Sequence, residues 1–303
     1  MFVDNMLSQK PLNSSFLGSP TIEFEDYIYE KVFYAQINQN NTYLQSLLFD
    51  AHIHLTDPVY SAYIHHLLTS LRAMKINACC VAVDSKSSLR TFELFGSSTR
   101  DIVTRFIGVH PQFAVTENIT EFIEIFNNNS ELIDGIGEIG LDPVYAGDNK
   151  ISYDKQKEVF YTMLRLSEST RKPVSIHSRG SLDEILDVLS TYRTGNVLLH
   201  WFSGSKKQLR KCMDMGLYVG YGPVLVYSAE KGVLLKHTDI EHFLVETDGP
   251  VNYSKCFKGL TSISSSFLIS VINAASGVLG KTFYETRDIL TKNSEAFLSN
   301  RPS

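Results

Sequence analysis

The stretch LLFDAHIH, residues 47–54, holds the pattern that decides the fold, because a short apolar run passes there directly into acidic and imidazole side chains. Seven more apolar runs follow along the chain: INACCVAV (76–83), RFIGVH (105–110), LIDGIGEIG (132–140), PVSIHS (173–178), NVLLHWF (196–202), GLYVGYG (216–222) and HFLVETD (242–248). Runs of this kind, rich in β-branched or aromatic residues, are typical of strands buried on both faces of a parallel sheet.

Helical patterns separate these runs. The apolar positions that share a helix face are Tyr63, Leu67, Leu71 and Met74, then Val159, Phe160, Met163 and Leu164, then Leu182, Ile185, Leu186 and Leu189. Ser181 and Glu184 open the third pattern as a capping box. Strand followed by helix, repeated eight times over residues 47–303, predicts an α/β fold of the (β/α)₈ TIM-barrel type. An open doubly wound sheet is the alternative, but no GxGxxG follows the first run, which weakens a dinucleotide-binding version of it.

Residues 1–46 precede the barrel pattern as an N-terminal extension. The extension starts polar and becomes aromatic and acidic in TIEFEDYIYEKVFYAQ, residues 21–36. We expect a partly helical segment that covers the barrel bottom or a neighbouring subunit. A poorly ordered tail with one docked helix fits the same pattern.

The overall composition is that of a globular protein with a sizeable core, since 43% of the residues are apolar. The formal charge of −5 gives no sign of a nucleic-acid binder, although bound metal cations would let an acidic chain bind phosphates. The four cysteines form no CxxC pair, and Cys79 and Cys80 lie in an apolar run, which predicts a reducing, cytoplasmic location. We see no signal peptide, and the apolar stretch at 267–280 is too short and too polar for a membrane span.

Histidines and carboxylates gather at the ends of the predicted strands, where the active site of such a barrel lies. Five of the nine histidines fall there with two acids: His52, His54, His110, His177, His200, Glu138 and Asp248. His52 and His54 stand two residues apart, so both point to one side of their strand. Taken singly, each histidine fits a hydrogen-bonded core residue, Glu138 fits an ion pair, and Asp248 fits a turn before Gly-Pro.

Taken together, these residues indicate a metal centre. The candidate ligands are four of the five strand-end imidazoles together with Glu138 and Asp248. Four imidazoles and two carboxylates exceed the three or four protein ligands of a mononuclear site. The surplus predicts two divalent ions that share a carboxylate, about 3.5–4 Å apart in sites of this kind. Imidazole ligands favour Zn²⁺, Mn²⁺ or iron over Mg²⁺.

Six motifs in this order resemble those of the TatD family of metal-dependent deoxyribonucleases, within the amidohydrolase superfamily. The motifs are DAHIH (50–54), GVHP (108–111), GEIGLD (137–142), PVSIHSRG (173–180), LLHWFSGS (198–205) and ETDGP (246–250). The match runs from about Phe49 to the C-terminal helices, and Gln156 and Asn293 also suit the family. One HxH is a weak signal, but six motifs in register are specific.

The resemblance implies one distribution of ligands: His52, His54 and Asp248 on the first ion, His177 and His200 on the second, and Glu138 between them. It implies hydrolysis of phosphodiester bonds in DNA, often from a 3′ end, with Mg²⁺ or another divalent cation, and hence a DNA or nucleotide substrate as partner. The N-terminal extension departs from the family pattern. Trp201 and Gly249 also fill positions that smaller or more polar residues often hold.

A mechanism follows as a hypothesis. Asp248 accepts the proton of a water that the metals activate, which makes Asp248 and Glu138 the catalytic pair. His110 and Arg179 contact phosphate oxygens. The acids expected to hold the imidazoles by their free N–H groups are Asp50, Asp142 and Glu246. A basic set, Lys206, Lys207, Arg210 and Lys211, either steers a polyanion or forms an ordinary solvated helix face.

Two other functions fit the same residues. An amidohydrolase-type enzyme acting on a small amide, ester or phosphoester would use the same metal-activated water. Glu138 stands where a carboxylated lysine bridge would be expected, which argues against the phosphotriesterase-like branch. A non-catalytic scaffold that kept the barrel is the third hypothesis, but the complete ligand set speaks against it.

Overall fold

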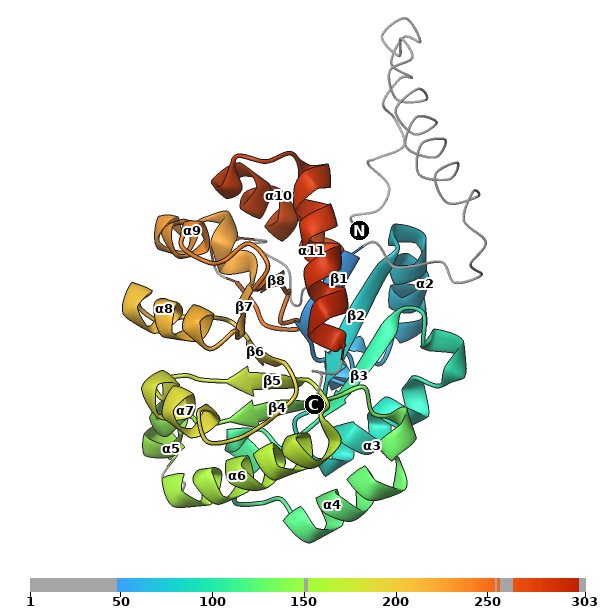
Figure 1. The fold of residues 1–303 in the computed structure, drawn as a ribbon. Helices are drawn as coiled ribbons and strands as arrows, with labels where there is room; N and C mark the ends of the chain where they lie inside the picture. Colours follow the sequence, from blue (N-terminus) through green and yellow to red (C-terminus); the bar gives the residue numbers. More distant parts are fainter. Residues whose placement is uncertain (1–47, 150–151, 254, 257–263, 300–303) are drawn as a thin grey trace, which may run out of the picture. The chain divides into compact units, whose positions relative to one another are not determined.

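A single parallel sheet organises the chain from residue 48 onward. The computed structural model describes residues 48–149, 152–253, 255–256 and 264–299. The strands are β1 (Leu48–Ile53), β2 (Ile76–Val81), β3 (Val103–Ile107), β4 (Gly135–Gly140), β5 (Val174–His177), β6 (Val197–Leu199), β7 (Tyr218–Tyr221) and β8 (Phe243–Val245). Each strand pairs in parallel with the next one along the chain, in the order β1 to β8 (Figure 1).

Backbone hydrogen bonds join β1 to the segment that follows β8. The amide of His54 donates to the carbonyl of Gly249, and the amide of Asp248 donates to the carbonyl of His52, both at 2.8 Å. These bonds bring the first and last strands of the sheet together at their carboxyl ends. The eight strands therefore form a barrel, which confirms the predicted (β/α)₈ fold and excludes the open doubly wound sheet.

Helices pack around the sheet, as Figure 1 shows. They are α2 (Ile64–Met74), α3 (Ser85–Leu94), α4 (Ile119–Asn128), α5 (Pro143–Asn149), α6 (Tyr153–Thr170), α7 (Leu182–Leu189), α8 (Lys206–Asp214), α9 (Ala229–Lys236), α10 (Leu268–Leu279) and α11 (Phe283–Leu298). The predicted apolar faces of α6 and α7 are buried in full. The face predicted for α2 is buried less completely, because Met74 is half-buried and Tyr63 precedes the helix and is 38% exposed.

The capping box predicted at the start of α7 is wrong. The hydroxyl of Ser181 makes no cap hydrogen bond and donates instead to the carbonyl of Leu141, at 2.7 Å. Glu184 accepts a hydrogen bond from the hydroxyl of Tyr153, at 2.6 Å. Both side chains are therefore used to fasten α7 to other parts of the barrel, a tertiary demand that overrides the local capping pattern.

Aromatic rings fill the inside of the barrel near its amino end. Phe297 of α11 lies 6.1 Å from the ring of Phe106 in β3 and 5.4 Å from that of Tyr218 in β7, measured between ring centroids. Strands β3 and β7 are not neighbours in the sheet, so a side chain that contacts both must reach across the interior. Phe297 is fully buried and closes this end of the core.

Two further sequence-based expectations concern the N-terminal extension and a possible membrane span. The N-terminal extension over residues 1–46 lies outside the described residues. Within the described chain, no single helix is long and apolar enough to cross a membrane, and only a pair bent by 107°, Ser265–Leu279 with Phe283–Leu298, reaches that length and composition.

The position of Phe297 leads to a prediction about stability. Phe297→Ala should lower the free energy of unfolding by about 3–5 kcal/mol, because it leaves a cavity between rings that cannot collapse together. Tyr284→Ala is the matched control: it removes an aromatic ring from the same helix, but at a position that is 50% exposed, and should cost no more than about 0.5 kcal/mol. Urea unfolding measures both, and equal losses would contradict the role of Phe297.

Candidate metal centre

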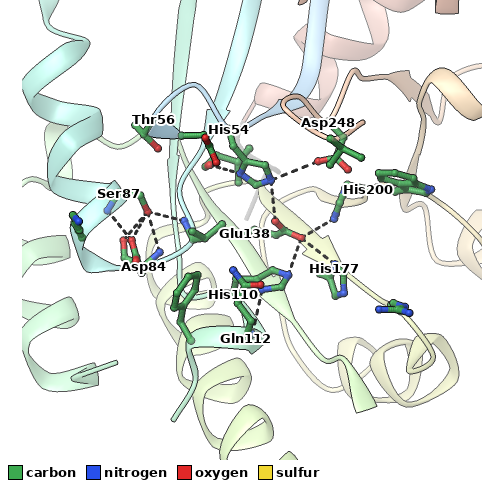
Figure 2. Close-up of a pocket in the computed structure, with 18 of the residues that line it drawn as sticks. His54, Thr56, Asp84, Ser87, His110, Gln112, Glu138, His177, His200 and Asp248 are labelled. Atoms are coloured by element: carbon green, nitrogen blue, oxygen red, sulfur yellow. Dashed lines mark hydrogen bonds and ion pairs between the residues drawn. The ribbon is translucent and has the colours of Figure 1, made fainter. Parts of the chain in front are cut away.

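The structure brings all six predicted ligands together at the carboxyl end of the barrel. Each comes from the end of a different strand or the residues just after it, except for the pair from β1 (Figure 2). The contributors are His52 and His54 from β1, Glu138 from β4, His177 from β5, His200 after β6 and Asp248 after β8. The side chains therefore converge because strand ends of a parallel barrel share one rim.

One oxygen of Glu138 faces the histidines of β1. Its Oε2 lies 3.5 Å from Nε2 of His52 and 3.5 Å from Nε2 of His54, and these two nitrogens are 3.4 Å apart. Oδ1 of Asp248 lies 3.8 Å from the first nitrogen and 3.5 Å from the second. Atoms that bind one cation at about 2.0–2.2 Å in tetrahedral geometry lie roughly 3–3.5 Å from one another. This first group therefore fits one divalent ion with little rearrangement.

The other oxygen of Glu138 faces a second set of imidazoles. Its Oε1 lies 2.7 Å from Nε2 of His200, 3.1 Å from Nδ1 of His177 and 3.4 Å from Nε2 of His110. Figure 2 shows this carboxylate in the middle of the cluster, with its contacts running to both sides. Glu138 is thus placed to share its two oxygens between two cation sites.

Hydrogen bonds at the far side of the rings fix how several imidazoles present their nitrogens. Nδ1 of His54 donates to the carbonyl of Val81, at 2.9 Å, which leaves the lone pair of Nε2 directed at the cluster. Nδ1 of His52 lies 2.9 Å from the hydroxyl oxygen of Ser175. His177 uses Nε2 to contact Oδ2 of Asp142, at 2.9 Å, and so turns Nδ1 to Glu138.

Asp142 is itself held in place. Its backbone amide donates to the side-chain oxygen of Gln156 at 2.9 Å, and the side-chain amide of Gln156 contacts the Asp142 carbonyl at 3.3 Å. The predicted contact between Asp142 and an imidazole is therefore present and rests on a buried partner from α6.

His110 differs from the other histidines of the cluster. Its Nδ1 accepts a hydrogen bond from the backbone amide of Gln112, at 3.2 Å. A neutral imidazole carries one proton, so that proton must sit on Nε2. Nε2 of His110 is then a donor rather than a metal ligand, which agrees with the substrate contact expected from the sequence.

Two carboxylates expected to hold imidazoles, Asp50 and Glu246, accept hydrogen bonds from neighbouring loops. Asp50 accepts hydrogen bonds from the amide and hydroxyl of Thr247, at 2.8 and 2.6 Å, and so fastens the segment that leads to Asp248. Glu246 accepts from the backbone amide of Trp201 and stays 3.9 Å from Nδ1 of His200, beyond hydrogen-bond distance. The expectation was wrong for Asp50, whose carboxylate binds the neighbouring loop, whereas Glu246 forms an ion pair with His200 in addition to its bond to the loop.

The cluster carries protons that a cation would replace. Burial alone would raise the pKa of Glu138, but His110 and His200 outweigh it and hold that pKa well below its ordinary value. Burial opposes protonation of His54 and His177, yet hydrogen bonds with Asp248 and Asp142 raise each pKa to about 9. The carboxylates are thus stabilised by positive charge around them, which either protons on the imidazoles or divalent cations supply.

Two residues at the rim adopt an unusual backbone conformation. Trp201 has φ 45° and Asp248 has φ 52°, in the left-handed region that few non-glycine residues occupy. Each such residue costs on the order of 1–3 kcal/mol and persists where its surroundings over-determine it. For Asp248 the restraint comes from the bond between Asp50 and Thr247 and from the bond of its own amide to β1. For Trp201 it comes from the bond of its amide to Glu246.

A cavity of about 840 Å³ opens over the cluster. The metal-centre residues His54, Glu138, His177, His200 and Asp248 line one part of it. Arg179 lines it as an exposed side chain, whereas none of the basic residues predicted on α8 does, and Lys211 of that set pairs with Asp187 at 2.5 Å.

Sequence reasoning missed several participants. Ser175, which contacts His52, is the lone polar side chain between Pro173 and His177, so its placement on the inward face had a signal in the pattern. The carbonyl of Val81 and the hydroxyl of Thr247 had none, since their partners lie far away in the sequence.

Comparisons with known proteins identify relatives of this chain and a shared fold. A family model described as "TatD related DNase" matches residues 49–299. The "uncharacterized metal-dependent hydrolase YabD" of Bacillus subtilis is 29% identical over 256 residues, 82% of this chain and 98% of YabD. The deoxyribonuclease TATDN3 of Homo sapiens is 24% identical over 214 residues, 67% of this chain and 78% of TATDN3. The crystal structure of YJJV, a TatD homologue from Escherichia coli K12, shares the fold, with a TM-score of 0.73, 22% identity, and 85% and 99% of the two chains covered.

The two-sided position of Glu138 predicts how metal content responds to substitution. After dialysis against Mn²⁺, the wild-type protein should retain about two ions per chain. His177→Ala should retain about one ion, because it removes a ligand from one side only, and Glu138→Gln should retain fewer ions than His177→Ala, because it weakens both sides. Inductively coupled plasma mass spectrometry gives the content.

His66→Ala serves as the control for this measurement, since His66 is exposed on α2 and should leave the metal content unchanged. A wild-type protein that saturates at one ion, or an unchanged content in His177→Ala, would show that Glu138 does not join two cation sites.

Proposed function

The chain belongs to the TatD-related DNase family, and we propose that it is a metal-dependent hydrolase that cleaves phosphodiester bonds in DNA. The observation that carries the proposal is the position of Glu138, whose two oxygens face separate groups of ligands below an open cavity. Such an arrangement suits a hydrolysis in which both the attacking and the leaving oxygen need stabilisation.

The residues present fit two divalent cations. His52, His54 and Asp248 would hold one, and His177 and His200, which both contact Oε1 of Glu138, would hold the other, with Glu138 shared by both. When bound, the cations lower the pKa of water and neutralise charge on the phosphate oxygens. The imidazole-rich donor set favours Zn²⁺ or Mn²⁺, whereas Mg²⁺ is what the family resemblance implies.

Asp248 is the proposed proton acceptor. Its carboxylate is buried beside His54, and its left-handed backbone and the bond from its amide to β1 fix its direction. The water oxygen forms the new bond to phosphorus, its proton passes to Asp248, and the ester oxygen leaves and takes up a proton.

Two other side chains would contact the phosphate. The Nε2–H of His110 is directed at the cluster and has Glu138 as its only acceptor within the described chain, so an oxygen of the substrate can take its place. Arg179 follows His177 at the rim, where its exposed guanidinium can pair with a phosphate oxygen in the bidentate manner of arginine.

A reducing, cytoplasmic location is also part of the proposal. All four cysteines are free, and Cys79, Cys80 and Cys212 are buried, which is typical of proteins that are kept reduced.

Substitution of the proposed base tests the chemistry. Asp248→Asn should lower kcat on end-labelled single-stranded DNA by about 10²–10⁴-fold, because the amide keeps an oxygen for the cation but cannot take up the proton. Metal content must be measured on the same sample to separate loss of the base from loss of an ion.

Asp214→Asn is the matched control, since Asp214 is an exposed carboxylate at the end of α8 that does not line the cavity. Wild-type turnover by a metal-loaded Asp248→Asn protein would rule out this base. Preferred cleavage of RNA or of a small amide or ester in a parallel panel would overturn the assignment of DNA as substrate.

A further inference from the structure

The cavity extends well beyond the metal centre, to the first turns of α3. Besides the cluster it is lined by Lys86 and Arg90 of α3 and by Ser61, which precedes α2. Its volume of about 840 Å³ is near the upper end of the range of roughly 300–1,000 Å³ found for pockets that enclose drug-sized ligands. A single phosphate group at the cluster would leave this part of the cavity empty.

Arg90 reaches the cavity with donors to spare. Its Nη2 donates to the hydroxyl of Ser61 at 2.8 Å, which holds the guanidinium in place. Its Nε is buried and has no hydrogen-bond partner among the described residues. That nitrogen is shielded from the open cavity, so the donors left for a ligand are Nη1 and the second N–H of Nη2, which form no hydrogen bond with the described residues.

Lys86 adds a second cation on the same helix face, one turn before Arg90. Its side chain is exposed and makes no ion pair with any residue that the structure describes. The two nearby carboxylates of the cavity wall are used locally: Asp57 accepts from the amide of Val59 at 2.9 Å, and Asp84 accepts from the amide of Ser87 at 2.7 Å. Among the described residues, neither carboxylate forms an ion pair with Lys86 or Arg90 within 4.0 Å.

The opposite wall of the cavity carries the lone tryptophan of the sequence. Trp201 stacks on Tyr253 with ring centroids 5.3 Å apart and an interplanar angle of 21°. Trp201 follows β6 and α3 follows β2, so the two walls stand four strands apart in a ring of eight, with the metal centre between them. A ligand that crosses the cavity passes over the cluster.

We propose that Lys86 and Arg90 form a second phosphate site, which binds the phosphate next to the one that is cleaved. The inference rests on the proposed function and names its substrate more closely: an oligonucleotide of at least three nucleotides, with two consecutive phosphodiester groups. The guanidinium of Arg90 binds phosphate oxygens through its remaining N–H donors, and Lys86 contributes a point charge.

Two substrates that differ in one phosphate test the site. A thymidine dinucleotide contains one phosphodiester, and a thymidine trinucleotide contains two. The variant Lys86→Ala/Arg90→Ala should lower kcat/KM for the trinucleotide by roughly tenfold or more, the loss expected for a charge-assisted hydrogen bond, and leave the dinucleotide within about twofold. The variant Lys86→Arg/Arg90→Lys, which keeps both charges, should recover most of the trinucleotide activity.

Lys236→Ala/Lys292→Ala is the matched control, since it removes the same charge from two exposed positions that do not line the cavity. An equal loss on both substrates, or no loss on the trinucleotide, would overturn the second phosphate site.

A binding measurement separates this inference from the proposed chemistry. As the lone tryptophan, Trp201 reports occupancy of the cavity by its fluorescence. Phosphorothioate-linked trithymidylate, which resists hydrolysis, should bind the wild-type protein tighter than the dithymidylate, and the Lys86→Ala/Arg90→Ala variant should lose that difference. If neither the ordinary dinucleotide nor the ordinary trinucleotide is cleaved with any divalent ion, yet the phosphorothioates show the difference in binding, the proposed function fails and the phosphate site stands. If cleavage occurs without the difference, the phosphate site fails alone.

Discussion

A buried carboxylate that needs positive charge on both sides is the constraint on which the structure depends. Glu138 is 3% exposed, and a lone carboxylate at that depth would be too costly to keep ionised. Imidazoles from four other strands surround it. Strands β3 and β5 pair directly with β4, but the histidines of β1 and β6 reach Glu138 only because the sheet curves into a barrel. The fold and the metal centre therefore depend on the same curvature of the sheet.

The closure of the barrel acts on the same residues. The bond from the Asp248 amide to the His52 carbonyl joins the last strand to the first, and it also orients two members of the cluster. Asp50 adds a second tie to this junction through Thr247. The same hydrogen bonds thus close the barrel and position the metal ligands. They also hold Asp248 in a left-handed backbone conformation that a loop without these bonds would leave.

An acidic chain can act on a polyanion when its positive charge is local. The formal charge of −5 would repel DNA at a distance, yet the cavity combines a cation-binding cluster with Lys86, Arg90 and Arg179 on its walls. The basic residues of α8, which stand out in the sequence, do not line the cavity. The basic side chains that can contact a bound phosphate are therefore those that line the cavity, and a cluster of basic residues in the sequence does not identify them.

The sequence by itself determined the strand–helix alternation, the (β/α)₈ barrel and the six residues that meet at its rim, because burial and periodicity are local and parallel strand ends coincide in any such barrel. Only the tertiary structure decided the partners. Asp50 bonds to Thr247, 197 residues away, instead of an imidazole, and Ser175 rather than an acid contacts His52. The bond that holds Arg90 to Ser61 likewise follows from a contact with another segment of the chain. Side-chain partners depend on distances between residues far apart in the chain, and no periodic pattern records those distances.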